Sequence, residues 1–257
     1  MPINIPVKQN QRLEQLLARI EHDAELAQYW RCANINAVDR MKMSDHGYVH
    51  VKIVANMAVK LMRLLVDAGI EPSVVKDHGL TPDDAEVVVV LASLMHDLGM
   101  AVHRDNHETY SLFIANRQLP KLLTGIYEQA DLLTIISEVL HAIIAHRPDE
   151  QCLTIEAGVV KVANALDISQ GRSRIPFEAG KVNIHSVSAM AIDAVHLKKG
   201  ESKPVLIEII MNNSAGIYQL DELLKHKLKS SGIEGYLEVE ARIEGETDKK
   251  LIRLYNL

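Results

Sequence analysis

The sequence has few of the residues that build thiolate or disulfide sites. Its 257 residues include only two cysteines, Cys32 and Cys152, and no CxxC pair. This excludes a disulfide framework and a zinc–thiolate site. Any metal must therefore be bound through nitrogen and oxygen ligands.

Long apolar runs and basic clusters are also lacking. The longest apolar stretch, residues 86–95, is far shorter than the roughly 20 residues that a membrane helix needs. No basic segment followed by an apolar run stands at the start, so we expect a cytoplasmic protein without a membrane span. A net charge of −6 argues against binding to a nucleic-acid polymer. A small anionic substrate would need a local basic pocket.

Two patterns of apolar residues divide the chain. Apolar residues make up 47% of it, enough for one large core or two modest ones. Helical periodicity continues to about residue 175, and beyond about residue 181 apolar and polar residues alternate. We therefore predict an α + β protein with an all-α domain at residues 1–176 and a small domain at residues 177–257.

The best-defined predicted helix covers residues 81–98. Thr81 is a suitable N-cap, Pro82 occupies the first helical position and Gly99 can end the helix. Because residues 87–95 are apolar on nearly every side, this helix is expected to be central and buried. Further helices are predicted at about residues 9–30, 45–68, 106–116, 131–146 and 154–169.

The C-terminal segment has the predicted order β-β-α-β-β. Strands are expected at about residues 189–197, 205–211 and 237–243, with a hairpin through residues 245–248 and a helix capped by Ser214. One helix over a small antiparallel sheet would bury both faces. If residues 237–243 form an exposed edge, pairing with a second copy would cover it, so we predict a homodimer.

Histidine is abundant, and eight of the twelve lie between His46 and His146. The pair His96-Asp97 follows the buried helix, where exposed carbonyl groups disfavour a carboxylate. A divalent cation bound by both residues would compensate. Alternatively, His96 is a core histidine and Asp97 pairs with an arginine.

Two residues on other helices point to a shared metal site. His50 lies on the apolar stripe of its predicted helix, and Asp167 lies on the apolar face of another. Both side chains are therefore expected to point inward. Together with His96 and Asp97 they could converge on one ion.

This ordered set, H then HD then D, resembles the HD-domain superfamily of metal-dependent phosphohydrolases. His50, His96-Asp97 within the HDLG motif, and Asp167 match that pattern over about residues 44–175. The resemblance implies an HD-type catalytic domain in which His96 and Asp97 serve the hydrolysis of a phosphomonoester or phosphodiester, with a nucleotide as one candidate substrate. Many relatives carry lysine where this chain has Met100, so a phosphate ligand of that kind is missing here.

The resemblance extends to a branch of the superfamily that binds two metal ions. His107 resembles the first residue of the His-Glu pair in that branch, and His146 resembles a later histidine; His141 is a weaker alternative because it lies on the polar face of its helix. Each of the three is alternatively a surface or structural histidine. We expect one or two ions of Mn²⁺, Fe²⁺ or Mg²⁺, and imidazole ligands favour the transition metals. Two ions bridged by Asp97 would activate a water for attack on phosphorus.

Basic residues near these positions are predicted to bind phosphate. Arg104, Arg172 and Arg174 are the main candidates, with Arg147 beside them, because guanidinium groups bind phosphate oxygens in pairs. Alternatively, arginines after a helix are there because the helix dipole favours them.

Two other functions remain open. Inositol oxygenase and its relatives have a similar ligand pattern, which makes a di-iron oxygenase the second enzyme class. A non-catalytic module that binds a nucleotide or regulates another protein is the third, because fold resemblance alone is a weak guide to function.

Overall fold

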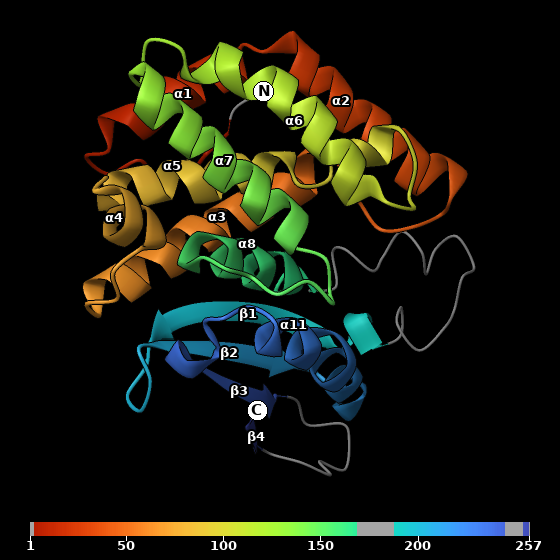
Figure 1. The fold of residues 1–257 in the computed structure, drawn as a ribbon. Helices are drawn as coiled ribbons and strands as arrows, with labels where there is room; N and C mark the ends of the chain where they lie inside the picture. Colours follow the sequence, from red (N-terminus) through yellow and green to blue (C-terminus); the bar gives the residue numbers. More distant parts are fainter. Residues whose placement is uncertain (1–2, 169–187, 245–253, 257) are drawn as a thin grey trace.

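The computed structural model describes residues 3–168, 188–244 and 254–256. Figure 1 shows helices stacked above a small sheet, and the α + β class is confirmed. Residues 3–168 are called the helical part below, and residues 188–256 the C-terminal part. The predicted boundary near residue 176 lies outside the described residues, so the division into two domains stays a prediction.

Helix α5 (Pro82–Met95) lies at the centre of the helical part. Its start is capped because the Asp84 carboxylate accepts hydrogen bonds from the Thr81 backbone N–H at 2.9 Å and the Thr81 hydroxyl at 2.7 Å. Every residue from Asp84 to Met95 is buried, as the apolar run predicted. The residues that follow α5, His96 and Asp97, therefore also lie inside the protein.

The other helices pack around α5. Among them α1, α3, α4, α7 and α8 contact it directly. The elements are α1 (Gln11–Glu21), α2 (Ala24–Asn34), the π-helical segment η1 (Ile35–Arg40), α3 (Tyr48–Asp67), α4 (Ser73–His78), the 3-10 turn η2 (Leu98–Ala101), α6 (His107–Leu123), α7 (Gln129–Ala145) and α8 (Ile155–Ala165).

The observed helices differ from the predicted ones in two places. The single helix at residues 9–30 is divided into α1 and α2, because the Asp23 carboxylate accepts a hydrogen bond from Leu26 N at 2.9 Å and starts a new helix. Helix α4 was not predicted. Its first turn is stabilised from outside by the buried carboxylate of Glu156, which accepts a hydrogen bond from Val74 N at 3.0 Å.

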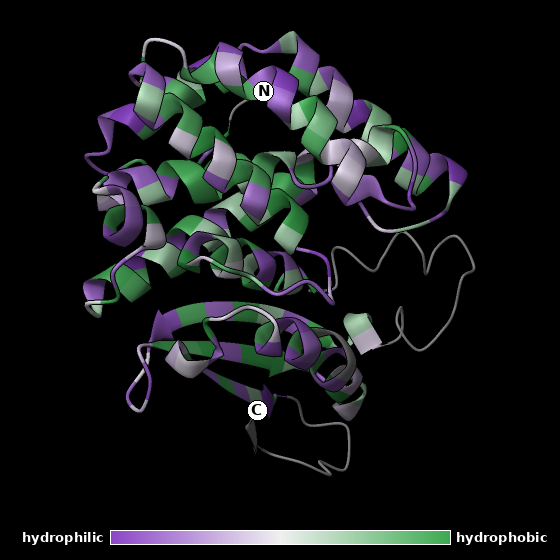
Figure 2. Cartoon of the chain, viewed as in Figure 1, coloured by the Kyte–Doolittle hydropathy of each residue, from purple (hydrophilic) through white to green (hydrophobic). Residues whose placement is uncertain are grey.

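The C-terminal part contains a four-stranded sheet of order β1-β2-β3-β4. Figure 2 shows both hydrophobic and hydrophilic residues on the strands. The prediction of a fully antiparallel sheet is wrong, because β2 and β3 are parallel, with Val205 opposite Leu237. The strands are β1 (Ile192–Lys199), β2 (Val205–Met211), β3 (Leu237–Ile243) and β4 (Leu254–Asn256).

The parallel pair follows from the connection between β2 and β3. This segment contains η3 (Ser214–Gly216), the π-helical η4 (Gln219–Leu224), α11 (Lys225–Lys229) and η5 (Glu234–Tyr236). A helical crossover returns the chain to the same end of the sheet, as parallel neighbours require. The predicted exposed edge at residues 237–243 is also wrong, because β3 lies between β2 and β4. The homodimer prediction thereby loses the feature on which it rested.

The two parts are packed together. Helix α3 contacts β1 and β2, and α8 contacts α11. Buried apolar side chains from both parts belong to one continuous core. Among the described residues, none of the helices combines the length and the apolar character needed to cross a membrane.

Gly158 lies at the closest approach between α8 and the C-terminal part. An ideal Cβ at this position would be 2.3 Å from the Ser231 carbonyl oxygen and 3.1 Å from Ile233. We expect Gly158→Ala to lower the free energy of unfolding by about 1–3 kcal/mol, because overpacking outweighs the roughly 1 kcal/mol gain in helix propensity. Chemical denaturation measures this change. The control is Gly235→Ala, where nothing lies within 4 Å; equal effects of the two substitutions would contradict the tight contact.

Candidate metal centre

Four buried histidine side chains from four helical segments meet around one buried carboxylate, that of Asp97. His50 comes from α3, His96 and Asp97 from the end of α5, His107 is the first residue of α6, and His146 follows α7. None is more than 6% exposed. These five residues are called the Asp97 cluster, and they form two groups that share Asp97.

The first group, called the His50 group, consists of His50, His96 and Asp97. The Nε2 atoms of the two histidines are 3.2 Å apart. Each of them lies 3.3 Å from Oδ2 of Asp97. One cation could therefore contact two imidazole nitrogens and one carboxylate oxygen.

The second group, called the His107 group, consists of Asp97, His107 and His146. It uses the other carboxylate oxygen, Oδ1, which lies 3.2 Å from His107 Nε2 and 3.8 Å from His146 Nε2. The rings of His96 and His146 have centroids 4.8 Å apart, so the two groups are adjacent. Asp97 could therefore offer one carboxylate oxygen to each group.

The other ring nitrogens of these histidines are held by acceptors. Nδ1 of His96 donates to the Ser93 carbonyl at 2.8 Å, and Nδ1 of His146 donates to the Ile143 carbonyl at 2.5 Å. Nδ1 of His50 donates to the Asp167 carboxylate at 2.6 Å. In the neutral ring the proton is then on Nδ1, so Nε2 presents a lone pair to the cluster.

His107 differs because Arg104 contacts its Nδ1 in two ways. Both the carbonyl oxygen and the Nη1 atom of Arg104 lie 2.9 Å from this nitrogen. The carboxylate of Glu108 lies 3.4 Å from the same atom. Its Nε2 still faces Asp97, as in the other three histidines.

The electrostatics favour neutral imidazoles around an ionised carboxylate. Burial lowers the pKa of His96, and burial lowers the pKa of His146 well below its usual value. Burial would raise the pKa of Asp97, but the surrounding imidazoles outweigh it and hold that pKa well below its usual range. Neutral histidine and ionised aspartate are the forms that bind metals. The cluster is thus suited to a divalent cation.

Asp167 lies at the edge of the cluster. The structure brings it to Nδ1 of His50, whereas the sequence predicted direct ligation of the metal, and it belongs to neither group of candidate ligands. A carboxylate in this position orients the imidazole and raises its basicity.

The structure describes two of the four predicted phosphate-binding arginines, Arg104 and Arg147. Arg104 is exposed and contacts His107. Arg147 lies 3.4 Å from the Glu108 carboxylate and donates to the Thr109 hydroxyl at 2.7 Å. Both are therefore near the His107 group. Arg172 and Arg174 lie outside the described residues.

His141 is separated from the cluster. It belongs to neither group, and its Nε2 accepts a hydrogen bond from Leu153 N at 3.1 Å. Of the two alternatives that the sequence left open, the structure places His146, and not His141, beside Asp97. The difference follows from helix geometry, because side chains five positions apart, such as those of His141 and His146, point to different sides of a helix.

Gly99 has a role that its predicted function as a helix terminator did not reveal. An ideal Cβ here would lie 1.9 Å from the His107 carbonyl oxygen and 2.6 Å from Ser111 N. Only glycine allows the turn after Asp97 to touch the start of α6 so closely. Ser111, which also contacts this turn, was missed; its only sequence feature is its position one helical turn after His107.

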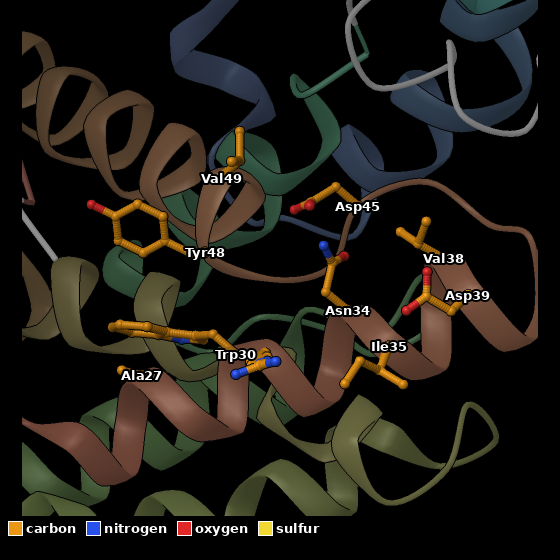
Figure 3. A pocket seen from close by; sticks show the side chains of 10 residues that line it. Ala27, Trp30, Asn34, Ile35, Val38, Asp39, Asp45, Tyr48 and Val49 are labelled. Carbon is orange, nitrogen blue, oxygen red and sulfur yellow. The ribbon is translucent and has the colours of Figure 1, made fainter.

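An open cavity of about 320 Å³ lies beside the start of α3, and none of the Asp97 cluster lines it. Figure 3 shows Trp30, Asn34, Asp45 and Tyr48 around it. Asp45 links this cavity to the metal centre, because its carboxylate accepts a hydrogen bond from His50 N at 3.1 Å. It therefore helps to hold the first turn of the helix that carries His50.

Comparisons with known proteins agree with this geometry. The family model described as HD domain matches residues 46–169. The chain is also 44% identical over 218 residues to the uncharacterized protein MJ1020 of Methanocaldococcus jannaschii. The aligned region covers 85% of this chain and 84% of that protein. No solved structure matches.

The two histidines of α7 provide a matched test of the cluster. We expect His146→Ala to weaken binding of one Mn²⁺ ion by about 10- to 100-fold or more, since a nitrogen ligand is lost. His141→Ala should leave metal binding unchanged. Elemental analysis after dialysis against Mn²⁺ measures the metal content. A loss in His141→Ala as large as in His146→Ala would contradict the assignment.

Metal binding should also stabilise the fold. An ion that binds only the folded chain is expected to add about 2.7 kcal/mol to the free energy of unfolding at 100 times its Kd. Thermal unfolding with and without Mn²⁺ tests this, with Na⁺ at equal ionic strength as a control. In His96→Ala most of the stabilisation should disappear. Equal stabilisation of both proteins would show that Mn²⁺ binds elsewhere.

Proposed function

We propose that this chain, which belongs to the HD-domain family, is a metal-dependent phosphohydrolase that cleaves a small phosphomonoester or phosphodiester. The observation that carries the proposal is the pair of ligand groups that share Asp97. A buried carboxylate surrounded by imidazole lone pairs needs a positive charge between them. Families with HD domains are typically metal-dependent phosphohydrolases, which agrees with that requirement.

We propose two ions, one in each group, with Asp97 contacting both. Imidazole supplies most of the ligands, which favours Mn²⁺ or Fe²⁺ over Mg²⁺. Bound divalent ions lower the pKa of a coordinated water and neutralise charge that develops on the phosphate. Asp167 would hold His50 in the orientation that ligation needs.

The residues around the His107 group would bind the substrate. Arg104 and Arg147 present guanidinium groups near His107, and paired N–H donors suit phosphate oxygens. Arg172 and Arg174 remain predicted phosphate ligands. Because these arginines would bind the negative charge of a phosphate group, the proposed substrate is a small phosphorylated molecule. A nucleotide is one candidate.

The proposal is tested with a panel of phosphomonoesters and phosphodiesters in the presence of Mn²⁺. We expect Asp97→Asn to lower kcat/KM by at least about 10³-fold, because the carboxylate shared by both groups is lost. Asp77→Asn removes the same charge from an exposed position on α4 and should leave kcat/KM unchanged. Phosphate release measures the rate.

Three other outcomes would contradict the proposal. Hydrolysis that persists in Asp97→Asn would place the chemistry elsewhere. Consumption of O₂ by the iron-loaded protein, without phosphate release, would favour the di-iron oxygenase. Binding of a nucleotide without turnover under any metal condition would favour a non-catalytic module.

A further inference from the structure

One buried hydroxyl group holds the backbone on both sides of Asp97. Ser111 Oγ donates a hydrogen bond to the His96 carbonyl oxygen at 2.6 Å and accepts one from Gly99 N at 2.8 Å. Ser111 is fully buried. The short segment that carries the shared carboxylate is therefore fixed before and after Asp97 by the same side chain.

Ser111 belongs to α6, the helix that begins at His107. The two residues are one turn apart, and Gly99 touches the backbone of both. The start of α6 has no side-chain cap, and Asn106 before it has a left-handed φ of 59°. The hydrogen bonds of Ser111 therefore connect this uncapped end of α6 to the segment that carries Asp97.

We propose that Ser111 is a positioning residue that sets the distance between Asp97 and His107, and thereby the affinity of the His107 group for its ion. This inference rests on the proposed function, because it requires an ion in each group. The hydroxyl is proposed as a ligand of neither the substrate nor an ion, since its hydrogen bonds go to backbone atoms. It acts by fixing the positions of the Asp97 carboxylate and the His107 imidazole.

The His50 group should depend less on this hydroxyl. His50 is oriented by Asp167, and the ring of His96 is held by the Ser93 carbonyl. Without the hydroxyl, the His96 carbonyl and the Gly99 N–H lose a hydrogen-bond partner in a buried site, which favours a rearrangement of the turn. We expect such a shift to change the distance from Asp97 to α6 more than the contact between Asp97 and His50.

The experiment measures Mn²⁺ binding to the full chain by titration calorimetry. The binding event that His107→Ala abolishes identifies the His107 group. In Ser111→Ala we expect that event to weaken by about 10- to 100-fold, the range seen when a partner of a metal ligand is removed, while the other event stays nearly unchanged.

Ser231→Ala is the matched control. Ser231 is also fully buried, and its hydroxyl likewise donates to a backbone carbonyl, that of Leu228 at 2.6 Å, and accepts from a backbone N–H, that of Ile233 at 3.2 Å, but it belongs to the C-terminal part and not to the Asp97 cluster. Both binding events should therefore be preserved in this variant. If Ser111→Ala does not fold, Ser111→Cys, which keeps the size but hydrogen-bonds weakly, is measured instead with the same expected result.

The possible results separate this inference from the proposed function. Two ions bound by the wild-type chain and by Ser111→Ala with equal affinities would overturn the inference alone. Equal weakening of both events in Ser111→Ala would also overturn it, since that result indicates general damage. Fewer than two ions in the wild-type chain would overturn the two-ion centre and this inference with it.

Discussion

The buried carboxylate of Asp97 imposes the main constraint on this structure. It is 3% exposed and surrounded by four imidazole rings, each of which presents Nε2 to one of its two oxygens. Lone pairs and a negative charge repel one another unless a cation lies between them. The arrangement therefore suits a divalent ion.

The fold satisfies this constraint with one buried helix. Because α5 is enclosed on all sides, its C-terminal end lies in the interior of the protein, and His96 and Asp97 follow it there. The chain then turns sharply through Gly99 and returns as α6, so that residues before and after the turn meet again at the carboxylate. Helices α3 and α7 complete the site from two other directions with His50 and His146.

The C-terminal part supports the metal centre although its sequence has no catalytic motif. Ser230, just after α11, donates a hydrogen bond to the Pro148 carbonyl at 2.9 Å, and its own carbonyl accepts one from Cys152 N at 3.0 Å. The loop that follows His146 is thus held from this side. Burial is the main cause of the lowered pKa of His146, and the positive charge of Lys227 on α11 acts in the same direction.

By itself the sequence determined the helical part, the buried α5 and the kinds of ligand, because periodicity, caps and residue type are local properties. It also placed His50, His96 and Asp97 in one family pattern. Only the tertiary structure decided that β2 and β3 are parallel, that His146 and not His141 reaches Asp97, and that Asp167 contacts His50. These features depend on distances between elements far apart in the chain, which no local pattern of residues contains.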